Sequence, residues 1–298
     1  MAKTAESSIF FPKEVDEDLF NIYKEFLIYI PTRRKSDNGE KEKIPCLFLR
    51  YPKSKNVLII FHCNGIDMFK ALKAFNMLVE NKKINVLVVE YPGYSIYESP
   101  ISTKKSLEDS LIIYDYIINH IKNITEKNIY ILGRSLGTGL AVYLSSKRNP
   151  AGVFLISPYT TFADVHKKRH TEELYKDLSK HFRSIDYIDT VKSPLLIIHG
   201  KKDDLIDFND AIKLYEKYNG NKKEIKLIEG MMHNNVDEFS LEKYIIDFVN
   251  KYCPLDNTEN DKENEFIFDD KEIYNPSKKI SKIIDYSKHN DYYFEYFY

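Results

Sequence analysis

The sequence predicts an α/β fold in which a mostly parallel β-sheet is covered by helices. Short β-branched apolar runs alternate along the chain with longer amphipathic stretches, and several of the short runs are apolar throughout, as strands buried on both faces require. Seven of the ten glycines also lie within a few residues of the end of such a run. Because ligand sites of open α/β sheets form in the tight turns at the carboxyl ends of the strands, we expect that edge to be the functional one.

Eight strands are expected in the sheet. Residues 25–30 and 44–50, which are separated by a polar stretch, predict an antiparallel hairpin leading into it. The apolar runs that follow predict the other six strands, at 57–62, 86–91, 128–132, 152–157, 194–199 and 224–228.

Helices are expected between these strands, on both faces of the sheet. They are predicted at 67–80, 103–121, 137–147, 209–217 and 238–252. In the second of them, Leu107, Leu111, Tyr114 and Ile118 recur at spacings of three and four. This periodicity predicts one apolar stripe packed against the sheet.

One large domain with an extension is expected from a chain of 298 residues. The domain is predicted to span residues 1–253, with room for a small cap of one or two short helices at 158–193. From residue 254 the pattern dissolves into polar residues, so 254–298 is predicted to be a C-terminal extension. Within it, residues 275–286 predict a short helix, and the aromatic residues 292–298 are expected to pack on the domain or on a partner.

The composition excludes some classes of protein. Hydrophobic residues make up 43% and charged residues 30%, which is typical of a globular protein with a substantial core and excludes disorder throughout. Forty-four Lys and Arg against 45 Asp and Glu leave a net charge of −1, so no whole-molecule field attracts nucleic acid. We therefore expect no nucleic-acid partner.

A membrane-spanning helix, secretion and N-myristoylation are not expected from this sequence. No apolar run approaches the roughly 18–20 residues of a membrane-spanning helix, and residues 1–12 lack both a signal-peptide core and the glycine that myristoylation requires. Cys46, Cys63 and Cys253 are scattered, without CxxC spacing, so neither a disulfide framework nor a thiolate metal site is expected. A cytoplasmic location is the expectation that follows.

The strongest chemical signal is a GxSxG motif at residues 133–137. It follows the apolar strand 128–132 and precedes a stretch of small, helix-compatible residues, which is the context of a nucleophile elbow. The glycines permit a sharp turn that presents the hydroxyl of Ser135 at a helix N-terminus. Since the chain has only ten glycines, chance accounts poorly for this motif, and Ser135 is the candidate nucleophile.

A serine nucleophile needs a base, and the base needs an orienting carboxylate. In folds with such an elbow, the acid and then the histidine follow the serine in the chain. The strand 194–199 runs into a loop with Asp203, whose spacing fits best, and with the rival acids Asp204 and Asp207. His233 follows the next strand and is the candidate base, whereas His199, at a strand end, is expected to hydrogen-bond the acid loop.

The oxyanion donors are expected at two backbone N–H groups. One belongs to the residue after the nucleophile, Leu136, and the other to the loop after the strand 57–62, where we assign Asn64. In the same loop, Cys63 fits a small buried cysteine better than a reactive thiol. No metal and no organic cofactor is implied by this set of residues.

These motifs together resemble the α/β-hydrolase fold, and more narrowly the alpha/beta-hydrolase domain-containing protein 17 group of palmitoyl-protein thioesterases. The similar segments lie between about Val57 and Val249, and the stretch at 199–208 followed by Leu-Tyr-Glu at 214–216 is the most specific. The others are 62–65, 91–94, 133–137, 156–158 and 233–234. The resemblance implies an α/β-hydrolase with a small cap, a triad of Ser135, Asp203 and His233, and removal of fatty acyl groups from S-acylated proteins.

The chain also departs from that group. Cys63 and Ser95 stand where the group usually has glycine, and residues 1–43 contain no counterpart of its cysteine-rich, acylated segment. The basic residues 166–170 offer a peripheral contact with anionic membranes, although their acidic neighbours favour an ordinary solvated face. We therefore expect membrane contact to be peripheral where it occurs.

The sequence specifies the substrate class less precisely than the triad. Tyr159 and Phe162 in the cap are candidates for a groove that binds an acyl chain, and the alternative is that they anchor the cap to the core. A lysophospholipase, a small-ester esterase and an oligopeptidase-like hydrolase remain rival enzymes, because a fold and a triad do not name the substrate. A non-catalytic interaction protein is the rival from another class.

Overall fold

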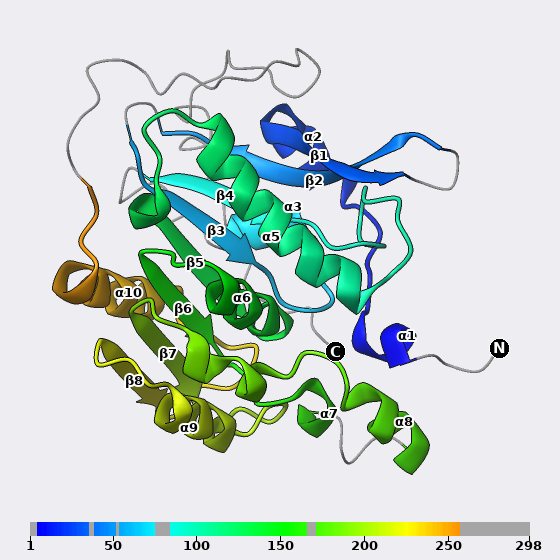
Figure 1. Ribbon diagram of the computed structural model, residues 1–298. Coiled ribbons are helices and arrows are strands. Elements are labelled where there is room, and N and C mark those ends of the chain that lie inside the picture. Colours follow the sequence, from blue (N-terminus) through cyan, green and yellow to red (C-terminus); the bar gives the residue numbers. More distant parts are fainter. Residues whose placement is uncertain (1–4, 36–38, 52–53, 75–83, 166–170, 257–298) are drawn as a thin grey trace.

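An eight-stranded sheet runs through the molecule in the order β1-β2-β4-β3-β5-β6-β7-β8 (Figure 1). The computed structural model describes residues 5–35, 39–51, 54–74, 84–165 and 171–256. β2 pairs antiparallel with both β1 and β4, and all other neighbours are parallel. The strands are β1 (Leu27–Lys35), β2 (Lys41–Leu49), β3 (Val57–Phe61), β4 (Asn85–Val89), β5 (Ile129–Arg134), β6 (Gly152–Ile156), β7 (Leu195–Gly200) and β8 (Lys223–Ile228).

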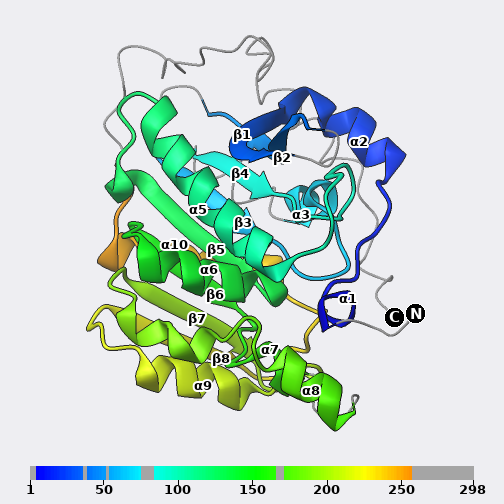
Figure 2. The same cartoon turned by 45° about the vertical axis from the view of Figure 1, so that its right-hand side comes forward.

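Helices cover both faces of the sheet. α5, α6 and α9 lie over one face, and α3 and α10 lie over the other (Figures 1 and 2). The helices are α1 (Ala5–Ile9), α2 (Glu17–Tyr23), α3 (Met68–Ala74), α5 (Thr103–His120), α6 (Leu136–Lys147), α7 (Phe162–Val165), α8 (Glu172–Leu178), α9 (Phe208–Lys217) and α10 (Glu238–Tyr252). Short 3₁₀ turns lie at 24–26, 126–128, 184–186 and 188–190.

Two apolar cores follow from the alternation of side chains along the strands. In β3, Val57, Ile59 and Phe61 point into the core beneath α5, α6 and α9, whereas Leu58 and Ile60 point into the core beneath α3 and α10. All five are at most 2% exposed. This double burial is the reason why the strand reads as apolar at every position.

The predicted sheet and the hairpin at its start are confirmed, and the predicted helices are found with small shifts of their ends. The helix predicted at 67–80 is described as far as Ala74, and its remainder lies outside the described residues. α1 and α2 are additional to the prediction. The segment 158–193 contains α7 and α8, while the basic residues 166–170 and the tail from 257 onward lie outside the described residues.

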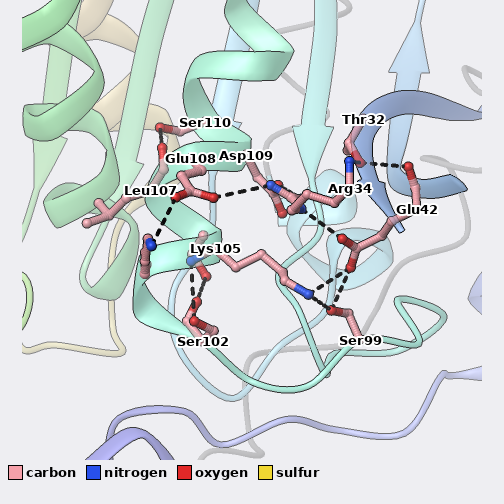
Figure 3. Close-up of polar contacts among 12 residues, drawn as sticks. Thr32, Arg34, Glu42, Ser99, Ser102, Lys105, Leu107, Glu108, Asp109 and Ser110 are labelled. Carbon is pink, nitrogen blue, oxygen red and sulfur yellow. Dashed lines mark hydrogen bonds and ion pairs between the residues drawn. The ribbon is translucent and has the colours of Figure 1, made fainter. Parts of the chain in front are cut away.

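A network of charged side chains joins the hairpin to α5 (Figure 3). Arg34 on β1 lies between two carboxylates, since its Nε donates to Glu42 at 2.8 Å and its Nη2 donates to Asp109. Lys105 also contacts Glu42, at 2.9 Å, and Tyr97 donates its hydroxyl to Asp109 at 3.0 Å. Asp109 is 1% exposed, so an acid is buried at this junction with its partners around it.

None of the described helices combines the length and the apolar composition that crossing a bilayer requires.

Candidate active site

Ser135 occupies a sharp turn between β5 and α6. Its backbone has φ of 50° and ψ of −116°, a conformation that residues other than glycine rarely adopt. The turn is close-packed, because a Cβ atom added to Gly137 would lie 2.0 Å from the carbonyl oxygen of Phe61 at the end of β3. A Cβ on Gly133 would lie 2.6 Å from the carbonyl oxygen of Gly137. The two glycines are therefore required by close approach, as expected for an elbow between a strand and a helix.

Ser135, His233 and Asp203 form a chain of hydrogen bonds, although almost 100 residues separate the serine from the histidine in sequence. His233 Nε2 lies 3.0 Å from Ser135 Oγ, and His233 Nδ1 lies 2.8 Å from Asp203 Oδ2. The histidine is 5% exposed and the serine 6%. With Nδ1 donating to the carboxylate, Nε2 is left to accept the serine proton, which is the arrangement that general-base activation of a hydroxyl needs.

Asp203 is held as an ionised acceptor. Its Oδ1 accepts the backbone N–H groups of Leu205 and Ile206, at 3.0 and 2.8 Å, and its side chain has no exposed surface. Burial alone raises the pKa of Asp203, but hydrogen bonds from His199 and His233 outweigh it, so the net pKa lies below the ordinary value. A permanently charged Asp203 favours the imidazolium that forms when His233 takes a proton.

The rival acids have other roles. Asp204 is exposed, and Asp207 caps the N-terminus of α9 by accepting the N–H of Asn209 at 2.9 Å. His199 lies beneath the loop, with Nε2 3.0 Å from the carbonyl oxygen of Ile206 and 3.3 Å from Asp203 Oδ2. Among the three acids, the geometry therefore selects Asp203 as the partner of His233.

The two expected oxyanion donors come from adjacent segments. Leu136 is the first residue of α6, where N–H groups have no partner within the helix. The loop that carries Asn64 starts beside it, since a Cβ on Gly137 would also approach the carbonyl oxygen of His62 to 2.8 Å. The close packing of β3 against α6 thus brings both expected N–H groups to the same end of the sheet.

The side chain of Asn64 has a role that the sequence did not indicate. Its amide nitrogen donates to the carbonyl oxygen of Ile9 at 2.6 Å, and its amide oxygen accepts the N–H of Phe11 at 2.9 Å and the hydroxyl of Tyr94 at 2.6 Å. Phe10, between them, is 2% exposed and packs edge-on against Tyr94. The N-terminal segment is therefore hydrogen-bonded to the candidate oxyanion loop. The apolar Ile-Phe-Phe run at residues 9–11 was the feature of the sequence that could have indicated that this segment packs on the domain.

Arg134, the variable residue of the motif before Ser135, was also not singled out. Its side chain is 8% exposed and donates from Nη2 to the carbonyl oxygen of His233 at 3.3 Å. It connects the elbow to the loop that carries the histidine.

Tyr159 and Phe162 lie within the core and not on an open surface. Tyr159 is 0% exposed and donates its hydroxyl to the carbonyl oxygen of Leu136 at 3.1 Å, and Phe162 is 3% exposed and packs edge-on against it. This placement favours the alternative in which the two side chains anchor residues 158–193 to α6.

Within the described ranges, no group of three or more His, Cys, Asp or Glu side chains is arranged to hold a metal ion.

Two family models match the chain. One, described as steryl acetyl hydrolase, matches residues 12–182, which is more than half of the chain, and the other, described as serine aminopeptidase S33, matches residues 173–239. The chain belongs to the α/β-hydrolase family. The resemblance found in the sequence motifs is confirmed by curated relatives of this hydrolase.

Human alpha/beta hydrolase domain-containing protein 17B is 30% identical over 201 residues, which are 65% of this chain and 66% of that protein. The mouse 17C protein is 28% identical over 211 residues, which are 69% of this chain and 63% of that protein. The matched region of this hydrolase thus spans slightly less than two thirds of these relatives. Among solved structures, the Pyrococcus furiosus esterase Pf2001 superposes with a TM-score of 0.61 at 16% identity, over 81% of this chain and 99% of the esterase, and shares the fold.

Proposed function

We propose that this α/β hydrolase is a serine hydrolase that cleaves thioesters or esters, and that it removes fatty acyl groups from S-acylated proteins. The observation that carries the proposal is the hydrogen-bond chain from Asp203 through His233 to Ser135, at 2.8 and 3.0 Å. The strained conformation of Ser135 supports it, because an elbow of this kind exposes the hydroxyl to a substrate.

In the proposed reaction, Ser135 Oγ attacks the acyl carbonyl carbon while His233 Nε2 takes the hydroxyl proton. Asp203 holds the imidazole in the correct tautomer and stabilises its charged form. The oxyanion of the tetrahedral intermediate accepts hydrogen bonds from the N–H groups of Leu136 and Asn64. His233 then protonates the departing thiolate or alkoxide, and a water molecule, activated by the same histidine, releases the fatty acid from Ser135.

An apolar acyl group fits the surroundings of the triad. Two large apolar side chains stay exposed on segments that reach the site: Met232, next to His233 in the chain, at 41%, and Phe11, whose backbone is bonded to the Asn64 side chain, at 50%. Each methylene that such side chains remove from water contributes about 0.8 kcal/mol, which favours long acyl chains over acetate. The similarity to the 17B and 17C proteins supports the same substrate class.

A second candidate is an esterase for short acyl groups. It is favoured by the family model described as steryl acetyl hydrolase and by the burial of Tyr159 and Phe162, which leaves these two side chains no surface for an acyl chain. The chemistry at Ser135 is the same, and only the preferred chain length differs.

Labelling with a fluorophosphonate probe tests the proposal first. The wild-type protein is expected to react, and Ser135→Ala is expected not to, whereas a protein without catalytic function labels in neither form. Values of kcat/KM for acyl chains of increasing length, and release of palmitate from an S-palmitoylated peptide, then separate the two candidates. A maximum at acetyl or butyryl with no activity on the peptide supports the short-chain esterase instead.

A further inference from the structure

We propose that a buried pair, His62 and Glu90, aims the peptide between Cys63 and Asn64 so that the Asn64 N–H points at the oxyanion. This inference rests on the proposed function and assigns His62 and Glu90 as positioning residues. Neither side chain has any exposed surface, and neither belongs to the triad.

The first step is the contact with the peptide itself. His62 Nδ1 lies 2.9 Å from the carbonyl oxygen of Cys63, and this carbonyl belongs to the same peptide unit as the N–H of Asn64. In a trans peptide the C=O and the N–H point in opposite directions. A donor that fixes the Cys63 carbonyl on one side therefore fixes the direction of the Asn64 N–H on the other.

The second step concerns the proton on His62. Its Nε2 lies 3.1 Å from Glu90 Oε1, and the Glu90 carboxylate also accepts two backbone N–H groups, from Met68 at 3.1 Å and Tyr91 at 3.0 Å. A backbone N–H only donates and a backbone carbonyl only accepts. The carbonyl oxygen of Cys63 can only accept, so Nδ1 carries the proton of that bond, and the contact between Nε2 and Glu90 holds the ring in this orientation.

The third step is the rigidity of the pair. The ring of Tyr91 stacks on the ring of His62 with centroids 4.1 Å apart, and the Tyr91 hydroxyl donates to the His62 carbonyl oxygen at 2.8 Å. His62 is held by its backbone, its ring face and both ring nitrogens, so it has little freedom to follow a moving peptide. A hydrogen bond in a buried, water-free site is electrostatically stronger than one in water, which suits a group that has to fix a peptide dipole.

This fixation matters because an oxyanion donor acts only when it is aimed before the reaction. Donors need to lie about 2.7–3.1 Å from the position that the oxyanion takes, and loss of one donor lowers kcat by about 10²- to 10³-fold. A peptide that rotates freely loses part of this effect without loss of the donor itself.

Two substitutions at His62 separate aiming from packing. His62→Asn places an amide nitrogen near the position of Nδ1 and retains a donor for the Cys63 carbonyl, whereas His62→Gln places its amide near Nε2 and removes that donor. We expect kcat of His62→Gln to fall by about 10- to 100-fold with little change in KM, and His62→Asn to recover a clear part of the loss. Both His62 substitutions are also combined with Glu90→Gln in double variants, because a buried carboxylate that has lost its partner destabilises the fold.

The inhibition constant of an acyl trifluoromethyl ketone reports on the oxyanion donors and is not expected to change if His62 serves only packing. Ser135 adds to this ketone, and the resulting oxyanion occupies the same hole as the intermediate. We expect its inhibition constant to rise across the folded His62 variants by the factor by which kcat/KM falls. Equal losses in His62→Asn and His62→Gln, or an unchanged inhibition constant, would overturn the inference.

The outcomes also distinguish this inference from the proposed function. If the wild-type protein and Ser135→Ala are equally inactive, the proposed function fails and the inference falls with it. If activity depends on Ser135 and His62→Gln matches the wild type, only the inference fails.

Discussion

Ser135 adopts a backbone conformation that costs of the order of 1–3 kcal/mol in a residue other than glycine. The surrounding structure holds it there, because its N–H donates to the carbonyl oxygen of Ile156 at 2.9 Å and its own carbonyl oxygen accepts the N–H of Thr138 at 2.9 Å. This conformation places Oγ within hydrogen-bonding distance of His233. Strain at one residue thus serves the chemistry of the whole site.

A difference between Asp203 and Asp204 is the first prediction, and it belongs to the residue scale. Asp203→Asn is expected to lower kcat by about 10⁴-fold, because the amide favours the wrong tautomer of His233. The control, Asp204→Asn, is expected to stay within a few-fold of the wild type, since Asp204 is exposed. Turnover of a p-nitrophenyl ester measures both, and a greater loss in Asp204→Asn with both proteins folded would contradict the assignment of the acid.

At the scale of elements, the N-terminal segment and the hairpin are joined to the hydrolase core in different ways. The N-terminal segment is held by the Asn64 amide and by Phe10, which packs edge-on against Tyr94 and Phe182. The hairpin is held by the charged network around Arg34 (Figure 3). The first junction therefore combines hydrogen bonds with an apolar contact, and the second is mainly electrostatic.

Adjacent phenylalanines provide a matched test of the apolar contact at the N-terminal junction. Phe10 is 2% exposed and Phe11 is 50% exposed. Phe10→Ala is expected to lower the free energy of unfolding by about 3–5 kcal/mol, because it removes a buried ring and leaves a cavity. Phe11→Ala is expected to change it by less than about 1 kcal/mol. Urea unfolding measures both, and similar losses in the two variants would show that the segment does not pack as described.

The electrostatic junction predicts a specific dependence on pH. Burial raises the pKa of Asp109 to about 6 despite its hydrogen bond from Arg34, whereas the pKa of Glu42 is about 2, because its bonds from Arg34 and Lys105 outweigh its burial. Between pH 4 and 6 the native state therefore holds a proton on Asp109 that the unfolded state has lost. Asp109 accordingly makes the free energy of unfolding fall as pH rises through this range.

The measurement compares Asp109→Asn with Glu42→Gln from pH 4.5 to 7. The stability difference between wild type and Asp109→Asn is expected to shift in favour of the variant as pH rises from 4.5 to 7, by about 2 kcal/mol. The difference for Glu42→Gln is expected to stay nearly constant, since Glu42 loses its contribution only as pH falls from about 4.5 through about 2. A flat difference for Asp109→Asn would refute the prediction.

At the scale of the whole molecule, the position of the site follows from the order of the strands. β3 lies between β4 and β5 in the sheet. After β3 the chain continues to β4 on one side of it, and it then crosses to β5 on the other side. The loops after β3 and β5 therefore run in opposite directions from this point of the sheet, which is where open α/β sheets bind their ligands. Both the candidate oxyanion loop and the elbow lie at that switch point.

The segment that follows α10 is hydrogen-bonded to the sheet. Asn56, before β3, exchanges two hydrogen bonds with the backbone of Asp256, at 2.9 and 3.1 Å, and the Tyr130 hydroxyl donates to the carbonyl oxygen of Cys253 at 2.9 Å. A chain that ends at Tyr252 is thus expected to melt about 5 °C or more below one that ends at Asp256, because three bonds of about 1 kcal/mol each are lost.

Comparison of the chain ending at Asp256 with the full chain tests the prediction made for the extension. If residues 292–298 pack on the domain or on a partner, removal of 257–298 lowers the melting temperature, the solubility or the binding of that partner. Unchanged values for all three would contradict the prediction.

The sequence by itself determined those features that short-range patterns encode. Strands buried on both faces are apolar at every position, and an elbow between a strand and a helix needs glycine at fixed offsets, so the sheet and Ser135 were recognisable from residues that are neighbours in the chain. The order of acid and base after the serine followed from the same pattern.

Only the tertiary structure decided which atoms meet. Asp203 and Asp204 are adjacent in the chain, and the turn after β7 directs one toward His233 and leaves the other exposed. On α5, Ile113 and Ile117 are buried together with Asp109, whereas Leu107 and Leu111 of the predicted stripe are only partly buried. A helical periodicity predicts that an acid such as Asp109 is exposed, because the pattern contains no information about its partner Arg34, which lies 75 residues away in the chain. A partner so far away in the chain leaves no mark in the sequence around Asp109 that a pattern reveals.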